Sequence, residues 1–197
     1  MILIKESDIL KTLIINGSPK KNGDTEVLVN ELVKYLNGEV KVISHKDKIE
    51  PCNDCRHCWS HAGCSVNDGM QDVYPFLQEC DNIVLASPIW FSSLSGPLLD
   101  ICSRIQTFWA AGYFRHESLP IKQKNGVLIM VGGEKGTEVV PTQNALTIMK
   151  FMNCHRPSVK KIYSLDTNNI PAQEDDRALK NCHAAAKWLN SRCCANS

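Results

Sequence analysis

The sequence predicts an α/β fold in which a five-stranded parallel sheet carries helices on both faces. Short runs rich in Val, Ile and Leu alternate with longer segments of helical periodicity. These runs are almost continuously apolar, as expected of strands that are buried on both faces. Three of them end in segments rich in Gly and Ser, where parallel sheets commonly bind ligands. We expect right-handed crossovers between consecutive strands.

The composition favours one domain spanning residues 1–197 that recognises small molecules. Its 22 Lys and Arg nearly balance its 21 Asp and Glu, which leaves a net charge of +1 and argues against nucleic acid or an anionic membrane as partner. The apolar runs are shorter than the roughly 20 residues needed to span a bilayer. The N-terminus lacks the residue order of a signal peptide, so we expect a cytoplasmic protein.

The first elements follow from apolar runs and turn residues. Residues 11–16 form a β-branched run that stops at Gly17, which predicts a buried strand ending in a tight turn. Apolar side chains recur at helical spacing over residues 25–36, and Gly38 closes this helix. We expect a second strand at residues 40–44, followed by a long loop.

The middle of the chain contains two predicted helices around a third strand. Residues 72–79 are helical in pattern, and Pro75 is tolerated there only in the first turn. The third strand is expected at residues 82–86. A long helix then opens at residues 95–97, with one apolar face made by Leu98, Cys102, Ile105 and Trp109.

The last third of the chain repeats the alternation of strand and helix. Residues 126–131 and 158–165 are the fourth and fifth predicted strands. Helices are expected at about residues 140–152 and 175–189. The pattern is therefore that of a sheet covered on both faces from end to end.

The segment after the first strand is suited to an anion. Residues 17–25 are rich in hydroxyls, small residues and backbone N–H donors and lead into a helix N-terminus. They match neither the Walker A loop nor the Gly-x-Gly-x-x-Gly turn. The residues alone leave two interpretations open: a site for the phosphate of a mononucleotide, or an ordinary turn with solvated lysines.

Two further strand ends are candidates for a flat ligand. Residues 87–92 combine adjacent aromatic rings with hydroxyls, which suits a planar, amphipathic ring system. The alternative is that Trp90 and Phe91 belong to the core. Glycines at 132 and 133 permit close approach of the backbone to a ring, although a plain turn explains them as well. We expect all three strand-end loops to converge.

Four of the ten cysteines form a compact motif with ligand spacing: Cys52, Cys55, Cys58 and Cys64. Successive Cys-x2-Cys steps favour an iron–sulfur cluster over zinc, although thiolates bind both. Alternatives are reduced thiols or a redox disulfide. His57 and His61 are within reach as alternative ligands, but an exposed loop position explains each of them better. The remaining six are expected to be buried or tail thiols: Cys80, Cys102, Cys154, Cys182, Cys193 and Cys194.

Residues 17–25 resemble the phosphate loop of the flavodoxin-like NAD(P)H-dependent FMN reductases, Gly-Ser-Pro-Arg-Lys-Asn-Gly-Asn-Thr. Lys20 replaces the Arg and keeps its charge without its planar fork, and Asp24 adds a negative charge in place of Asn. The resemblance implies that the FMN phosphate is bound by Ser18, Pro19, Lys20, Lys21, Asn22, Asp24 and Thr25.

Residues 87–96 look like the isoalloxazine loop of the same family, in which Trp90 replaces the usual Tyr. By this match the candidates along the flavin edge are Ser87, Pro88, Ile89, Trp90, Phe91 and Ser92. The N–H groups of a third loop, Gly132, Gly133 and Glu134, are implied to face the N1–O2 side. The helix that follows the second loop commonly ends Phe-Ile-Asp-Arg in this family, but here it reads Ile101-Cys102-Ser103-Arg104 and lacks the Asp.

The cysteine motif and the residues that follow it resemble those of the iron–sulfur flavoproteins, which carry a [4Fe-4S] cluster beside FMN. The resemblance spans about residues 11–165. It implies the strand order 2-1-3-4-5, with a cysteine-rich loop at residues 51–68 inserted after the second strand. Because flavin and cluster communicate across a subunit interface in that family, it also implies a homodimer or homotetramer.

The resulting hypothesis is an FMN-binding oxidoreductase with no assigned catalytic acid or base. Electrons would pass from a donor such as NAD(P)H or ferredoxin through FMN, and through the [4Fe-4S] cluster, to a quinone, an oxygen species or another acceptor. One alternative is an electron carrier like flavodoxin or ferredoxin, against which the near-neutral charge argues. Another is a zinc-stabilised nucleotide-binding domain.

Overall fold

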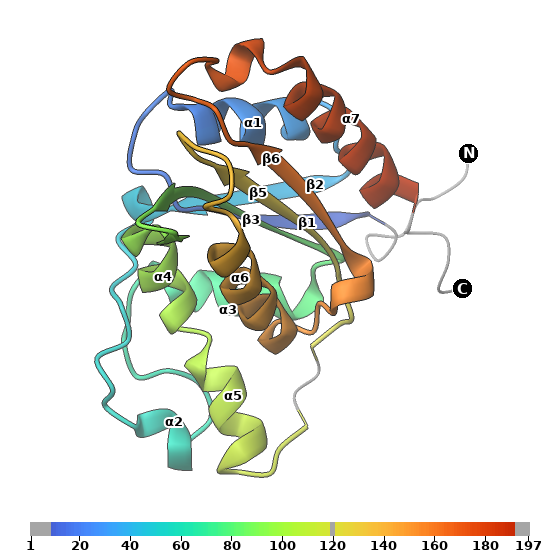
Figure 1. Cartoon of the computed structure of the whole chain (residues 1–197). Coiled ribbons are helices and arrows are strands. Elements are labelled where there is room, and N and C mark those ends of the chain that lie inside the picture. Colours follow the sequence, from blue (N-terminus) through green and yellow to red (C-terminus); the bar gives the residue numbers. More distant parts are fainter. Residues whose placement is uncertain (1–8, 119–120, 192–197) are drawn as a thin grey trace, which may run out of the picture.

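A computed structural model describes residues 9–118 and 121–191 of the chain. Its sheet contains five parallel strands in the order β2-β1-β3-β5-β6, and a sixth, short strand β4 pairs antiparallel with β3 (Figure 1). The strands are β1 Lys11–Asn16, β2 Glu39–Ser44, β3 Asn82–Trp90, β4 Ser93–Leu94, β5 Asn125–Val131 and β6 Val159–Ser164. The parallel α/β architecture is thus confirmed. The sheet has six strands and not the predicted five, because the short β4 follows β3 in the chain. The predicted order 2-1-3-4-5 therefore becomes 2-1-3-5-6, with β4 outside this path.

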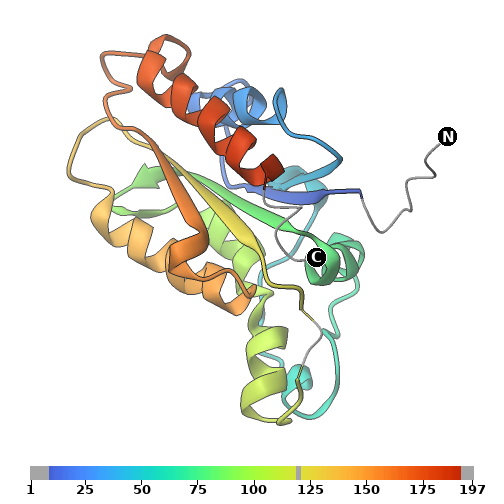
Figure 2. The same cartoon turned by 90° about the vertical axis from the view of Figure 1, so that its right-hand side faces the viewer.

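The helices cover both faces of this sheet. Figure 1 shows α1 and α7 on one face and α3, α4 and α6 on the other, while α2 and α5 extend away from the sheet together. Figure 2 shows the same layers from the side. The helices are α1 Asp24–Val33, α2 His57–Ser60, α3 Val73–Glu79, α4 Gly96–Ser103, α5 Gln106–Tyr113, α6 Val139–Phe151 and α7 Asp176–Ser191. No helix in the described ranges has both the length and the apolar character needed to cross a membrane.

Each face of the sheet has its own hydrophobic core, because successive strand residues point to opposite sides. Leu13 and Ile15 of β1 belong to the core beneath α3, α4 and α6, whereas Ile14 belongs to the core beneath α1 and α7. The same alternation occurs along β3 and β5. Burial on both faces explains why these strands are almost continuously apolar.

Two predicted elements differ most in extent, and the first helix ends at Val33, three residues earlier than predicted. The single helix expected after residue 95 is divided into α4 and α5, because the N–H groups of Arg104 and Ile105 bond carbonyls only three residues back. This turn directs α5 away from the sheet. Strand β3 continues to Trp90 instead of ending at residue 86, because its last residues pair with β4. Pro75 lies in the first turn of α3, as predicted.

Candidate functional site

The three strand-end loops meet at one edge of the sheet, as predicted. Strands β1, β3 and β5 are neighbours, and their carboxyl ends lie together. The N–H of Gly17 donates to the carbonyl of Ala86 over 2.8 Å, and the hydroxyl of Ser95 donates to the carbonyl of Gly17 over 2.7 Å. The chain order reverses between β1 and β3, which is the point where open α/β sheets bind ligands.

The first loop begins at a glycine that has no room for a side chain. A Cβ atom on Gly17 would lie 2.4 Å from Cβ of Leu98 and 2.7 Å from Oγ of Ser95. Both neighbours are buried at the start of α4. Gly17 therefore lets the chain after β1 run directly against α4, and this contact fixes the first loop against the second.

The rest of the first loop presents backbone donors and two exposed lysines. The N–H of Ser18 donates to Oδ1 of Asn16 over 3.0 Å, and Asn22 has a left-handed backbone with φ of 55°. Gly23 caps α1 without a side-chain hydrogen bond, so no side chain at that cap satisfies the first N–H groups of α1. Lys20 and Lys21 are exposed beside it. This end of α1 is suited to a phosphate group.

Two carboxylates in the first turn of α1 already have partners. Oδ1 of Asp24 accepts a hydrogen bond from the N–H of Ala172 over 2.8 Å, and the carboxylate of Glu26 accepts one from the N–H of Asn22. Asp24 thereby ties the segment after β6 to α1. The carboxylate of Asp24 accepts this hydrogen bond, and its negative charge lies near the first loop.

The second loop is a tight hairpin with two exposed aromatic rings. Trp90 pairs with Ser93, and the two residues between them, Phe91 and Ser92, have φ of 50° and 54°. Such a two-residue turn normally uses Gly or Asn, and other residues pay for it in backbone strain. Phe91 is 104% exposed and Trp90 is 44% exposed. The alternative that both rings belong to the core is therefore wrong.

The base of the second loop is held by two serine hydroxyls. Ser87 is fully buried, and its Oγ accepts a hydrogen bond from the N–H of Ser95 over 3.0 Å. Ser95 in turn caps α4 by accepting from Leu98. Pro88 and Ile89, which follow Ser87 along β3, are half-buried. Ser87 thus positions the hairpin from below, and Ser95, which was not among the predicted site residues, links the first loop to the second.

The third loop contains two glycines, Gly132 and Gly133, whose lack of a side chain allows close packing. The resemblance implied that the N–H of Gly132 faces the flavin. In the structure this N–H donates to the carbonyl of Ser164 over 2.9 Å, so it is not free for a ligand. A Cβ on Gly132 would lie 3.4 Å from Ile89, and one on Gly133 would lie 2.5 Å from the amide of Asn168. Glu134 is exposed. The two glycines therefore allow the end of β5 to pack closely against its neighbours.

The four motif cysteines lie apart from these loops, in the segment between β2 and α3. All four line one cavity of about 390 Å³ beside α5, together with Ser103, Arg104, Thr107 and Trp109. Cys52 and Cys55 are exposed, whereas Cys58 and Cys64 are half-buried. Sequence positions as far apart as 52 and 64 are thus brought to one hollow.

The thiols of this cavity have different electrostatic surroundings. A hydrogen bond with Ser65, whose Oγ lies 3.3 Å from Sγ of Cys55, lowers the pKa of the Cys55 thiol. Burial raises the pKa of the Cys58 thiol, and negative charge on Cys52 raises it further. Within residues 9–118 and 121–191, however, no three His, Cys, Asp or Glu side chains gather closely enough to hold a metal ion.

The other cysteines and the two histidines have structural surroundings. Cys80, Cys102, Cys154 and Cys182 are buried thiols, as predicted, while Cys193 and Cys194 lie outside the described residues. The rings of His57 and His61 stack with centroids 4.5 Å apart. His61 is exposed and His57 half-buried.

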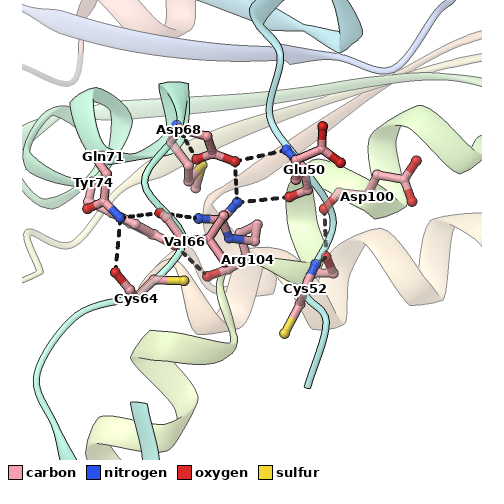
Figure 3. Close-up of polar contacts among 11 residues, drawn as sticks. Glu50, Cys52, Cys64, Val66, Asp68, Gln71, Tyr74, Asp100 and Arg104 are labelled. Atoms are coloured by element: carbon pink, nitrogen blue, oxygen red, sulfur yellow. Dashed lines mark hydrogen bonds and ion pairs between the residues drawn. The ribbon is translucent and has the colours of Figure 1, made fainter. Parts of the chain in front are cut away.

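Arg104 is a residue whose importance the sequence did not reveal. Figure 3 shows its guanidinium between the chain leading to Cys52 and the chain leaving Cys64. Burial disfavours its charged form, but the hydrogen bond to Asp68 and the interactions with Tyr74 and Cys64 together outweigh burial and raise the pKa of Arg104. The signal that could have found it is an Arg at the end of an otherwise apolar helix pattern, where a charged residue needs a partner.

Comparison with known proteins identifies the family of the chain. Residues 10–167 match the family described as NADPH-dependent FMN reductase. An iron–sulfur flavoprotein of Archaeoglobus fulgidus is 31% identical over 140 residues, which are 68% of each chain. An iron–sulfur flavoprotein of Methanosarcina thermophila is 25% identical over 187 residues, which are 91% of this chain and 93% of that protein.

A solved structure shows the same fold. The NAD(P)H:quinone oxidoreductase of Methanothermobacter marburgensis superposes with a TM-score of 0.65 at 14% identity. The superposition covers 93% of this chain and 96% of that one. At this identity the likeness concerns the arrangement of the sheet and its helices.

Proposed function

Because this chain belongs to the NADPH-dependent FMN reductase family, and so is a flavin-dependent oxidoreductase, we propose that it moves electrons from NAD(P)H to an acceptor with FMN held at the three loops. The observation that carries this proposal is the meeting of the three loops at the chain reversal, beside two exposed aromatic rings. Bound FMN supplies two-electron chemistry with the nicotinamide and one- or two-electron chemistry with the acceptor.

The first loop holds the phosphate in this proposal. The uncapped N–H groups of α1 and the hydroxyls of Ser18 and Thr25 supply hydrogen bonds, and Lys20 and Lys21 supply positive charge. Asn22 orients the loop through its left-handed backbone, and Pro19 precedes the lysines. Since Asp24 and Glu26 bond backbone N–H groups, neither carboxylate is left unpaired beside the phosphate.

The second and third loops hold the ring system. Trp90 and Phe91 offer exposed apolar faces at the strained turn of Phe91 and Ser92. Ile89 packs near Gly132 below them, with Ser87 and Pro88 as the base, while Gly133 and Glu134 border the site. Apolar walls with a few backbone donors suit an isoalloxazine ring.

We further propose that Cys52, Cys55, Cys58 and Cys64 bind a [4Fe-4S] cluster. Four thiols in one cavity are the donor set that such clusters require, and two relatives bear the name iron–sulfur flavoprotein. Because no three His, Cys, Asp or Glu side chains in residues 9–118 and 121–191 are grouped closely enough to hold a metal ion, cluster binding requires the cysteine segment to rearrange.

The remaining parts of the proposal come from the sequence: one domain over residues 1–197, a cytoplasmic location and a homodimer or homotetramer. An apolar groove of about 490 Å³ between α4, α5 and α6 supports self-association. It is lined by side chains that include Leu99, Trp109 and Phe151, and it shares Ser103, Gln106 and Trp109 with the cysteine cavity. A second copy covering this groove would also border the cysteines.

An absorption spectrum of anaerobically purified protein tests both cofactors on one sample. We expect flavin bands with about one FMN per chain, and about four irons and four acid-labile sulfides. Flavin without metal would overturn the cluster while leaving the reductase. A colourless protein would overturn the FMN site.

Turnover separates an enzyme with its own substrate from a carrier. With NADH or NADPH as the sole donor and a quinone as acceptor, we expect steady-state oxidation of the nicotinamide. Reduction of bound flavin only by a reduced protein donor would contradict the assigned use of NAD(P)H.

A further inference from the structure

We propose that Arg104 is a positioning residue that closes residues 50–68 into a loop and so brings the cysteines to one cavity. The closure is a property of the chain itself, and its use in holding a cluster rests on the function proposed above. Arg104 lies at the end of α4, where the chain turns into α5. Its guanidinium donates hydrogen bonds to two backbone carbonyls and to the carboxylate of Asp68.

The guanidinium of Arg104 joins both ends of the cysteine segment. Its Nη1 donates to the carbonyl of Glu50 over 2.8 Å, on the chain entering the segment. Its Nη2 donates to the carbonyl of Val66 over 3.2 Å, on the chain leaving it. Figure 3 shows these bonds joining the segment that enters the cysteine loop to the segment that leaves it. One side chain thus joins Glu50 and Val66, which are 16 residues apart in the sequence.

Asp68 completes a closed set of bonds with Arg104. Nη1 of Arg104 also donates to Oδ2 of Asp68 over 2.6 Å, and the same oxygen accepts from the N–H of Glu50 over 2.9 Å. Oδ1 of Asp68 accepts from the N–H of Met70 over 3.0 Å. The peptide of Glu50 is therefore held through its N–H by Asp68 and through its carbonyl by Arg104. Neither charge can be removed without loosening that peptide.

Neighbouring side chains extend the closure to the backbone of two cysteines. Oγ of Ser103 accepts from the N–H of Cys52 over 2.8 Å while donating to the carbonyl of Asp100. Nε2 of Gln71 donates to the carbonyls of Cys64, over 3.0 Å, and Val66, over 2.6 Å. These bonds fix the backbone of the first and last motif cysteines.

Burial makes the closure specific for arginine. The side chain of Arg104 is 0% exposed and that of Asp68 10%, so each charge depends on the other. The guanidinium of Arg reaches these acceptors from two separate nitrogens, Nη1 and Nη2, whereas all three N–H groups of a Lys ammonium are on one nitrogen. Nε of Arg104 has no partner among the described residues, and Arg104 lines the cysteine cavity. One donor is thus left for an acceptor that enters the cavity.

Hydrogen exchange on the metal-free full-length protein tests the closure directly. In Arg104→Gln we expect amide exchange in residues 50–70 to rise at least tenfold, with Arg104→Lys restoring less than half of the protection on a logarithmic scale. Arg156→Gln is the matched control, because Arg156 also donates to a side chain but lies outside the segment. Unchanged exchange in Arg104→Gln, or full rescue by Lys, would overturn the proposal.

Loading with iron and sulfide tests the link to the cluster. We expect Arg104→Gln to hold less than half of the wild-type iron per chain and to shift the reduction potential of the cluster that remains, while its FMN content stays at the wild-type level. Wild-type iron content and potential in the variant would overturn a role toward the cluster. If wild-type protein itself binds no iron, the cluster fails, and the exchange experiment still decides the closure.

A second variant keeps the test decisive if Arg104→Gln does not fold. Asp68→Asn retains an oxygen that can accept from Arg104 and Glu50 but removes the charge. We expect a smaller rise in exchange, at least threefold, confined to residues 50–70. A rise spread evenly over the sheet would mean that the pair supports the fold as a whole, which contradicts the assigned role.

Discussion

The loops at the sheet edge continue directly from buried strands, whereas the cysteine segment rests on side chains of α4 and α5. At the sheet edge, Gly17 and Ser95 join neighbouring strand ends through backbone atoms and one hydroxyl. In the cysteine segment, Arg104 and Ser103 hold the ends, and Arg115 donates to the carbonyl of Cys58 in the middle. The first region is positioned by the fold and the second by a few polar side chains.

Aromatic packing strengthens this contrast. The ring of Trp59 in α2 stacks on Phe114 beside α5 at 4.1 Å, and Arg56 lies over the same indole at 4.7 Å. These contacts support the cysteine segment without involving the sheet (Figure 1). The cysteine segment therefore depends on its own side-chain contacts with α4 and α5. Single substitutions at these contacts should loosen the cysteine segment while the loops at the sheet edge stay in place.

The largest effect is expected at the sheet edge itself. Gly17→Ala places a Cβ against Leu98 and Ser95, which are buried and have no free space to move into. We expect a loss of about 3 kcal/mol in the free energy of unfolding, measured with urea, because overpacking typically costs about 1–3 kcal/mol. FMN content should fall with it.

The control for Gly17 lies nearby in α4. A Cβ on Gly96 meets nothing within 4 Å, and its φ is not positive. Gly96→Ala should therefore leave stability unchanged or raise it by up to about 1 kcal/mol. Equal losses in the two variants would mean that the close approach at Gly17 does not position the loop.

Acid should loosen the cysteine segment before the sheet edge. Burial opposes ionisation of Asp68, but hydrogen bonds from Arg104 and two backbone N–H groups outweigh it and lower the pKa of this carboxyl. Because its pKa is lower in the folded state, its stabilisation is complete above the ordinary carboxyl pKa of about 4 and is lost as the pH falls through the folded value.

The comparison of wild type with Asp68→Asn measures this contribution. We expect the metal-free wild type to be about 2 kcal/mol more stable than the variant at pH 7, the usual size for hydrogen bonds to a charged group. The difference should shrink as the pH falls below about 4. Urea unfolding at several pH values checks this, and a difference that is constant with pH would exclude Asp68 as the titrating group.

Loss of an exposed ring should affect binding but not stability. Phe91 is 104% exposed, and Ala at this position would have the same strained backbone with positive φ as Phe91. Phe91→Ala therefore removes the ring without changing the strain of the turn. We expect FMN affinity, measured by flavin fluorescence, to fall about fivefold, or about 1 kcal/mol, since aromatic pairs contribute about 0.5–1.5 kcal/mol. Tyr35→Ala, at the far end of α1, should leave FMN affinity unchanged. Unaltered FMN affinity in Phe91→Ala would show that the ring of Phe91 does not contact the flavin.

The smallest effect concerns the phosphate. Lys20→Arg restores the planar fork that the family pattern carries at this exposed position. We expect FMN affinity to rise about twofold, or about 0.4 kcal/mol. Affinity for riboflavin should not change, because riboflavin lacks the phosphate. A similar rise for both flavins would place Lys20 away from the phosphate.

The sequence predicted the loops well and their internal construction less well. The apolar runs located all five parallel strands, and the strand ends located the three loops. The hairpin at Phe91 and Ser92 was missed because neither residue signals a turn with positive φ. The division between α4 and α5 was missed because apolar spacing continues across Arg104. The buried bonds of Ser87 and Ser95 depend on residues eight positions apart meeting across a turn.

By itself the sequence determined the alternation of strands and helices, the three loops and the four cysteines, because periodicity and ligand spacing are local properties of the chain. Only the tertiary structure decided that Arg104 joins Glu50 to Val66, that Asp24 serves Ala172, and that the N–H of Gly132 is occupied. Such partners lie far apart in sequence, and a buried charge or N–H group takes whichever acceptor the folded chain brings within reach.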